Sequence, residues 1–216
     1  MVKKMDDKKI KEQESNTKET RIHERVKENK LLLKILLVIG FFFIAILVAF
    51  FIMRYSARPD YNGVTFNVVQ EGELTFYQTA FNVIYKGKPT VYNFYLRNNP
   101  KELKKNVPFD GEIELRNIMV LNSTTENLFC DGDWNLAIGN LLNLNIFNID
   151  IMRDENASCS SEGDYMFVQI EEGEETKVEQ FGPSCYKLVV SDCEILPATE
   201  RFMIEVFSEV NTLLKE

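Results

Sequence analysis

Cysteine and histidine are the side chains with the most versatile chemistry, and the chain holds four cysteines and one histidine. The cysteines all lie in the second part of the sequence, at Cys130, Cys159, Cys185 and Cys193. They include no C-x-x-C pair, which argues against both a zinc knuckle and a thiol–disulfide oxidoreductase. An even number of cysteines instead predicts two structural disulfide bonds, which persist outside the cytoplasm.

The connectivity of these disulfides stays open among three pairings. Cys185 with Cys193 is the least favoured of them. Residues 186–190 are typical of one straight strand, about 17 Å long at 3.3 Å per residue. A disulfide needs Cα atoms within about 7 Å of each other, so the chain would have to fold back around Ser191 and Asp192.

The single histidine, His23, precedes the cysteine-containing part. That part therefore lacks the residues for Ser-His-Asp or Cys-His catalysis and for a His-ligated zinc site. The segment 131–135 has the D-x-D-x-N opening of a calcium loop, but Leu136 and Leu142 occupy the positions that require Gly and Glu. We interpret it as a helix N-terminus, capped by Asp131 or Asp133. We predict no catalytic residue, no metal site and no cofactor.

Two N-x-S/T sequons are candidates for glycosylation, at Asn122 and Asn156. Residues 54–216 also hold 26 Asp and Glu against 14 Lys and Arg. So many carboxylates leave room for a pair that hydrolyses a glycosidic bond, yet single out none. The acidic balance argues against nucleic acid as a partner, because phosphate binding requires a basic surface.

An apolar run at residues 35–53 separates these residues from the N-terminus. Its 19 residues include no charge, amide or hydroxyl, and as a helix they would extend about 28 Å, the thickness of a bilayer core. A buried core helix would show a polar stripe, and a cleaved signal peptide would need a small-x-small site after the run. The run therefore predicts a transmembrane signal anchor at 35–54, in contact with the lipid bilayer.

Charge sets the predicted orientation of this anchor. Residues 1–34 hold 11 Lys and Arg against 7 Asp and Glu, and five of these cations lie within fourteen residues of the run. The positive-inside rule places this end in the cytoplasm and the C-terminal part outside, in a single-pass cell-membrane protein. We predict a charged, disordered tail at 1–34, a linker at 55–62 and one extracytoplasmic domain at 63–216.

The outer domain is predicted to be α+β, with a mostly antiparallel sheet packed by two main helices, at 134–145 and 197–214; a three-layer α/β fold is the alternative. Odd positions from Tyr77 to Tyr85 and even positions from Thr90 to Leu96 are aromatic, aliphatic or β-branched, which indicates a hairpin with one buried face. A four-residue turn would pair Tyr85 with Thr90 and Phe81 with Phe94. In the last helix the stripe containing Phe202 and Val206 would face the core, and Arg201 would face solvent.

Three short stretches carry a resemblance: Arg97 to Leu103 (RNNPKEL), Asp154 to Cys159 (DENASC) and Cys185 to Arg201 (CYKLVVSDCEILPATER). With the charged leader and the anchor, the chain resembles uncharacterised single-pass membrane-anchored proteins of small-genome archaea. The resemblance implies the anchored topology and a cysteine-containing outer domain. It implies no activity and no functional residues.

These observations favour a membrane-anchored, non-enzymatic envelope module that binds a surface protein or ligand. One alternative is a histidine-free, carboxylate-dependent enzyme that acts on an envelope polymer, which requires a pocket with two converging carboxylates. The other alternative is a single-pass sensor. The sequence does not indicate an oligomeric state.

Overall fold

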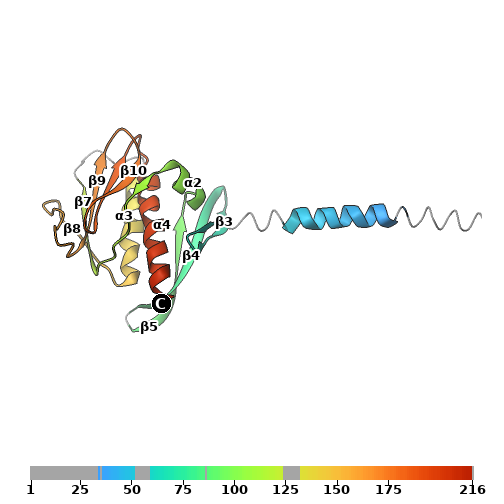
Figure 1. Cartoon of the computed structure of the whole chain (residues 1–216), viewed down its shortest axis with the longest axis horizontal. Helices are drawn as coiled ribbons and strands as arrows, with labels where there is room; N and C mark the ends of the chain where they lie inside the picture. The colour runs from blue at the N-terminus through green and yellow to red at the C-terminus, as the bar shows by residue number, and fades with distance from the viewer. Residues whose placement is uncertain (1–33, 35, 52–58, 86, 124–131, 216) are drawn as a thin grey trace, which may run out of the picture. The chain divides into compact units, whose positions relative to one another are not determined.

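The computed structural model describes residues 34, 36–51, 59–85, 87–123 and 132–215 (Figure 1). The chain divides into two units, Met1–Ser56 and Ala57–Glu216. In the first unit, residues 36–51 form a helix whose apolar side chains are exposed, Phe41 by 72%. None of the helices in the described ranges combines the length and the apolar character that crossing a membrane demands. Residue 35 and residues 52–54 of the predicted anchor lie outside those ranges, as do residues 1–33 of the predicted tail.

Two small antiparallel sheets open the second unit. Strands β1 (Asp60–Tyr61) and β2 (Val64–Thr65) form one of them. Strands β3 (Asn67–Glu71), β4 (Leu74–Tyr85) and β5 (Lys88–Leu96) form the other, in the order β3-β4-β5. The β4–β5 pair is the predicted hairpin, and its buried face carries Phe81, Val83 and Phe94 as expected.

The predicted register of this hairpin is wrong by two residues. Tyr85 pairs with Lys88 and Phe81 with Tyr92, because the strands are joined by two residues instead of four. Two-residue turns match the twist of paired strands and require residues with positive φ, and Gly87 has a φ of 75°. A shift of two leaves every side chain on its expected face, since strand side chains alternate with a period of two.

The larger sheet differs more from the prediction. It contains β6 (Phe109–Asp110), β7 (Ile118–Ser123), β8 (Asp150–Arg153), β9 (Met166–Glu172), β10 (Lys177–Gly182) and β11 (Cys185–Val190). Their order is β6-β10-β11-β9-β7-β8, and among these described strands only β10 and β11 pair antiparallel. The domain is α+β as predicted, and the two smaller sheets are antiparallel, but this six-stranded sheet pairs mostly in parallel.

Two connections explain two of the parallel pairs, β7 with β8 and β9 with β11. β7 reaches its parallel neighbour β8 through helix α3 (Asp133–Leu142) and the short 3-10 helix η2 (Asn143–Phe147), a β–helix–β crossover. β9 and β10 are joined by a short turn, yet β11 lies between them. The turn passes close over β11 at Gly173, where a Cβ would lie 2.2 Å from Cγ1 of Val189. Any larger residue at position 173 would force the side chain of Val189 or the turn itself to move.

Helix α2 (Pro100–Asn106) is a short helix in addition to the two that the sequence predicts. The side chain of Asn99 accepts a hydrogen bond from the N–H of Lys101 at 3.0 Å, and Pro100 is the first helical residue. The two predicted helices are present near their expected bounds, as α3 with η2 and as α4 (Ile195–Leu213). The residue that precedes α3 is Gly132, and Asp133 makes no side-chain cap.

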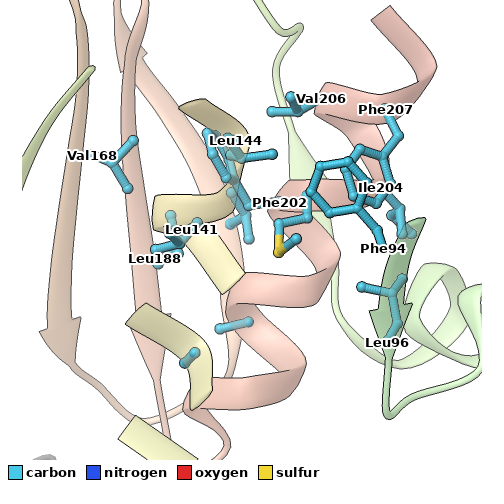
Figure 2. Close-up of a cluster of buried hydrophobic side chains, with 14 of the residues drawn as sticks. Phe94, Leu96, Leu141, Leu144, Val168, Leu188, Phe202, Ile204, Val206 and Phe207 are labelled. Atoms are coloured by element: carbon cyan, nitrogen blue, oxygen red, sulfur yellow. The ribbon is translucent and has the colours of Figure 1, made fainter. Parts of the chain in front are cut away.

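Helices α3 and α4 lie between the two larger sheets of the second unit (Figure 1). In Figure 2, Leu141 and Leu144 lie on the side of Val168 and Leu188, whereas Phe207 lies beside Phe94. Both flanks of α4 are therefore covered. Arg201 was predicted to face solvent, and this prediction is wrong, because the residue is only 4% exposed. A helix that is covered on both sides needs apolar side chains around most of its circumference, and α4 has them.

Replacing Phe207 with alanine tests this arrangement. The ring is fully buried, with its centroid 4.6 Å from that of Phe94 and 5.4 Å from that of Phe81. We expect Phe207→Ala to lower the free energy of unfolding by about 3–5 kcal/mol, since it removes a buried ring and leaves a cavity. Urea unfolding of the full chain in detergent micelles measures this change.

The matched control is Ile84→Ala on β4, whose side chain is 65% exposed. It should change the free energy of unfolding by no more than about 0.5 kcal/mol. Equal effects of the two substitutions would contradict the placement of α4 between the sheets.

Candidate functional site

Two grooves border the same part of strand β4, and they meet at the C-terminal end of helix α4. The larger has a volume of 590 Å³ and lies between β4, the segment 115–117, the turn after η2 and the end of α4. The smaller, of 430 Å³, lies between β2, β4 and the end of α4. Asn82 and Leu214 line both grooves, so they form one hollowed surface along β4.

The edge of β4 that faces β2 and β3 is only partly paired. β3 pairs with residues Leu74 to Gln78 of β4, which continues to Tyr85. In an antiparallel ladder, successive residues direct their backbone groups to opposite neighbours. Odd residues of β4 bond to β5, because Tyr85 faces Lys88 across the two-residue turn. The backbone groups of Ala80, Asn82 and Ile84 therefore point to the other side, where no strand of the described ranges pairs with them.

The lining of the grooves combines amides and apolar side chains with two cations, Arg116 in the larger groove and Lys215 in the smaller. Ile84, Leu213 and Leu214 are 65%, 52% and 57% exposed. Four asparagines contribute amides: Asn82, Asn117, Asn148 and Asn211. Neither groove is lined by an Asp or a Glu, although the domain is strongly acidic. The surface suits a ligand with backbone-like amides and apolar groups, and it supplies no carboxylate pair for glycoside hydrolysis.

Local hydrogen bonds hold the far wall of the larger groove. The C=O of Asn117 accepts from the N–H of Asp150 at 2.8 Å. Asn148 ends η2 with a φ of 60°, a left-handed conformation that asparagine tolerates better than most residues. The guanidinium of Arg116 donates to the C=O of Gly163 at 2.6 Å and pairs with Glu114 at 2.8 Å. These contacts position the wall before any ligand binds.

A second candidate is the carboxyl of Glu200, which is fully buried in α4. It accepts hydrogen bonds from the N–H of Arg97 at 2.7 Å, and from the N–H and side-chain amide of Asn98 at 2.9 and 2.8 Å. Burial raises the pKa of Glu200 to about 7, and the three donors oppose that rise only in part. Glu200 lies about 20 Å along the helix from Leu213. Its contacts tie the end of β5 to α4, which is a structural role.

Arg201 and Glu205 form a neighbouring polar cluster with Tyr61. Arg201 donates to the C=O of Val107 at 2.9 Å and pairs with Glu205, to which the hydroxyl of Tyr61 also donates. Burial is the main cause that raises the pKa of Tyr61 to about 12. Every polar group named here has a protein partner, so the cluster joins β1 and the end of α2 to α4 and offers no open position for a substrate.

The predicted cysteines are part of the scaffold. Cys159 and Cys185 form a disulfide with a Cα–Cα distance of 5.7 Å, which fastens the loop before β9 to the start of β11. Cys193 is also disulfide-bonded, whereas Cys130 lies outside the described residues. The pairing least favoured from the sequence, Cys185 with Cys193, does not occur.

The two sequons differ in their surroundings. Asn122 is 6% exposed, and its amide nitrogen donates to the C=O groups of Glu155 and Ala157 at 3.2 and 3.0 Å. That nitrogen is thus occupied in the folded domain. Asn156 is exposed. In the described ranges, no group of His, Cys, Asp or Glu is arranged to hold a metal ion, and Asp131 of the calcium-like segment lies outside them.

The sequence offered one signal for the groove. Asn82 alternates with the apolar positions of the hairpin, and a period of two places it on the exposed face. Apart from the neighbours of Asn82 on β4, the lining residues come from the β1–β2 turn and β2, the segment before β7, η2 and the turn after it, and the end of α4, which are distant in sequence. No local pattern could bring them together.

Comparison with protein-family models, with curated proteins and with solved structures found no match to this chain. The resemblance to anchored archaeal proteins stays a prediction.

The buried carboxyl of Glu200 predicts a specific pH dependence. Between pH 4.5 and about 7 the unfolded chain loses the proton of this residue while the folded chain keeps it. The free energy of unfolding should therefore fall as pH rises through this window, by up to about 3 kcal/mol, and this contribution should level off above it. Unfolding of the full chain at a series of pH values measures the slope.

Glu200→Gln should remove this part of the slope, because glutamine does not titrate. The control Glu209→Gln, on the same helix, should keep the wild-type profile. If Glu200→Gln and the wild type lose stability in parallel from pH 4.5 to 7, the buried carboxyl is not the group that titrates.

Proposed function

We propose that the chain is a single-pass membrane protein that carries a binding module outside the cell, anchored at 35–54 with its N-terminus in the cytoplasm. The 19-residue uncharged run and the exposed apolar side chains of the helix at 36–51 support the anchor. The excess of cations before the run supports the orientation, and the Cys159–Cys185 disulfide suits an extracytoplasmic domain.

We further propose that the module binds an extended, apolar segment of another envelope protein as an added strand along β4. The open backbone of Ala80, Asn82 and Ile84, bordered by both grooves, carries this proposal. Strand addition obtains affinity from backbone hydrogen bonds and specificity from pockets that receive alternate side chains. The apolar side chains of Leu213 and Leu214 and the absence of carboxylates from both linings favour an apolar segment over a cationic one.

The enzymatic alternative requires two carboxylates about 5 to 10 Å apart around a substrate. The grooves are lined by no Asp or Glu, so this surface does not favour it. In the sensor alternative, the same surface would bind the ligand and the anchor would transmit the signal across the membrane. Strand addition is the simplest function that these residues serve.

A defined peptide tests the proposal. The full chain is reconstituted in phospholipid nanodiscs and mixed with an acetylated seven-residue peptide of alternating Thr and Val. We expect at least tenfold slower amide exchange at Ala80, Asn82 and Ile84, because these N–H groups become donors to the peptide. A helix-forming peptide of Ala, Glu and Lys should leave their exchange unchanged.

The matched variants place proline at two exposed asparagines of the same sheet. Asn82→Pro removes an N–H from the open edge of β4 and should weaken peptide binding at least tenfold. Asn93→Pro removes an N–H from the outer edge of β5 and should not weaken it. No protection in the wild type, or equal loss in both variants, would contradict strand addition. A chain that does not co-purify with the discs would contradict the anchor.

A further inference from the structure

The outer edge of strand β5 is open along most of its length. β5 pairs with β4 through its even-numbered residues, since Lys88 faces Tyr85 across the turn. Val91, Asn93 and Tyr95 therefore direct their N–H and C=O groups outward, and no strand in the described ranges pairs with them. All three are exposed, Val91 by 64% and Tyr95 by 44%.

This edge lacks the protection that monomeric sheets usually carry. Natural edge strands are commonly interrupted by a charge, a bulge or a proline, which prevents pairing with another chain. Residues 89–96 of β5 contain no charged residue, and the β4–β5 register runs without a bulge. Its one proline, Pro89, stands at the end of the open stretch. The middle of the edge is suited to pairing.

We propose that two copies of this chain pair through their β5 edges, antiparallel, about a two-fold axis at Asn93. Asn93 then faces Asn93 of the second copy, and Val91 faces Tyr95 of the second copy on both sides of the axis. Each of these three pairs exchanges two backbone hydrogen bonds. Pairs of a β-branched residue with an aromatic residue are among the favourable cross-strand contacts. The edge is thus complementary to itself.

The ladder is limited at both ends, which makes the assembly a closed pair. At position 89 proline has no N–H to donate, and at position 97 the N–H of Arg97 already donates to Glu200 at 2.7 Å. Each copy uses this edge once, so a two-fold dimer satisfies it. The product is one continuous sheet, β3-β4-β5 joined to β5-β4-β3 of the second copy.

The dimer leaves the proposed peptide site open. The grooves lie on the side of β4 that faces β2 and β3, whereas the dimer uses the far edge of β5. The two surfaces are independent, and either proposal can fail without the other. A dimer would present two equivalent grooves.

The mass of the full chain in detergent micelles tests the pairing. Light scattering, corrected for bound detergent, should give twice the chain mass of 25.1 kDa. Asn93→Lys should halve the measured mass, because it places two like charges directly opposite each other on the axis. The matched control Asn82→Lys, an exposed asparagine on β4, should stay dimeric. Urea midpoints that agree between the two variants show that both are folded.

A cross-link provides the second measurement. Residues that form a hydrogen-bonded antiparallel pair have Cα atoms about 5.5 Å apart, within disulfide range. Under mild oxidation Asn93→Cys should form a reducible covalent dimer, and Asn82→Cys should not. A monomeric wild type would overturn the proposal. A dimer that Asn93→Lys leaves intact, or equal cross-linking of both cysteine variants, would also overturn it. Either of these last two results would place the contact elsewhere, such as between the anchors.

Discussion

Helix α4 packs against a sheet on each of its two flanks, with α3 adding apolar cover to the larger sheet and Phe147 of η2 to the smaller one. Phe202 contacts Tyr186 of the larger sheet, and Phe207 contacts Phe81 and Phe94 of the smaller one. A three-stranded sheet with a single apolar face is stable only when something covers that face. The position of β4 and β5, and of every surface built on them, therefore depends on α4.

The same helix carries buried charged residues, which are costly unless they are fully paired. Glu200 and Arg201 meet that requirement by binding backbone groups at the two ends of α2. The bonds from Glu200 to the N–H groups of Arg97 and Asn98 specify where β5 ends, and the bond from Arg201 to the C=O of Val107 specifies how α2 lies on α4. The apolar contacts supply most of the stabilisation, and the polar ones select a single arrangement.

The sequence predicted what depends on local periodicity. The hairpin face from Tyr77 to Leu96 and the position of α4 follow from alternation and helical spacing. The parallel order of the larger sheet did not follow from such patterns. Strands joined by a short turn, such as β9 and β10, usually pair directly, but here the chain crosses the end of β11 at Gly173 and β11 lies between them. Arg201 shows the same limit. A charged residue on a helix predicts a solvent-facing side, and nothing local in the sequence indicates that the C=O of Val107 and the carboxylate of Glu205 bind this side chain in the interior. The grooves combine elements far apart in the sequence, so no local pattern contains them.

Helix α4 makes one cooperative unit of both sheets, and the two open strand edges of the smaller sheet depend on it. Native-state hydrogen exchange of the full chain, followed with increasing urea, tests that claim directly. The most protected amides of α4, of β9 and β11, and of the β4–β5 ladder should open with the same free energy and the same urea dependence. Opening of the β4–β5 ladder at a much lower free energy, while α4 stays protected, would show that the small sheet is a separate unit and would contradict the account.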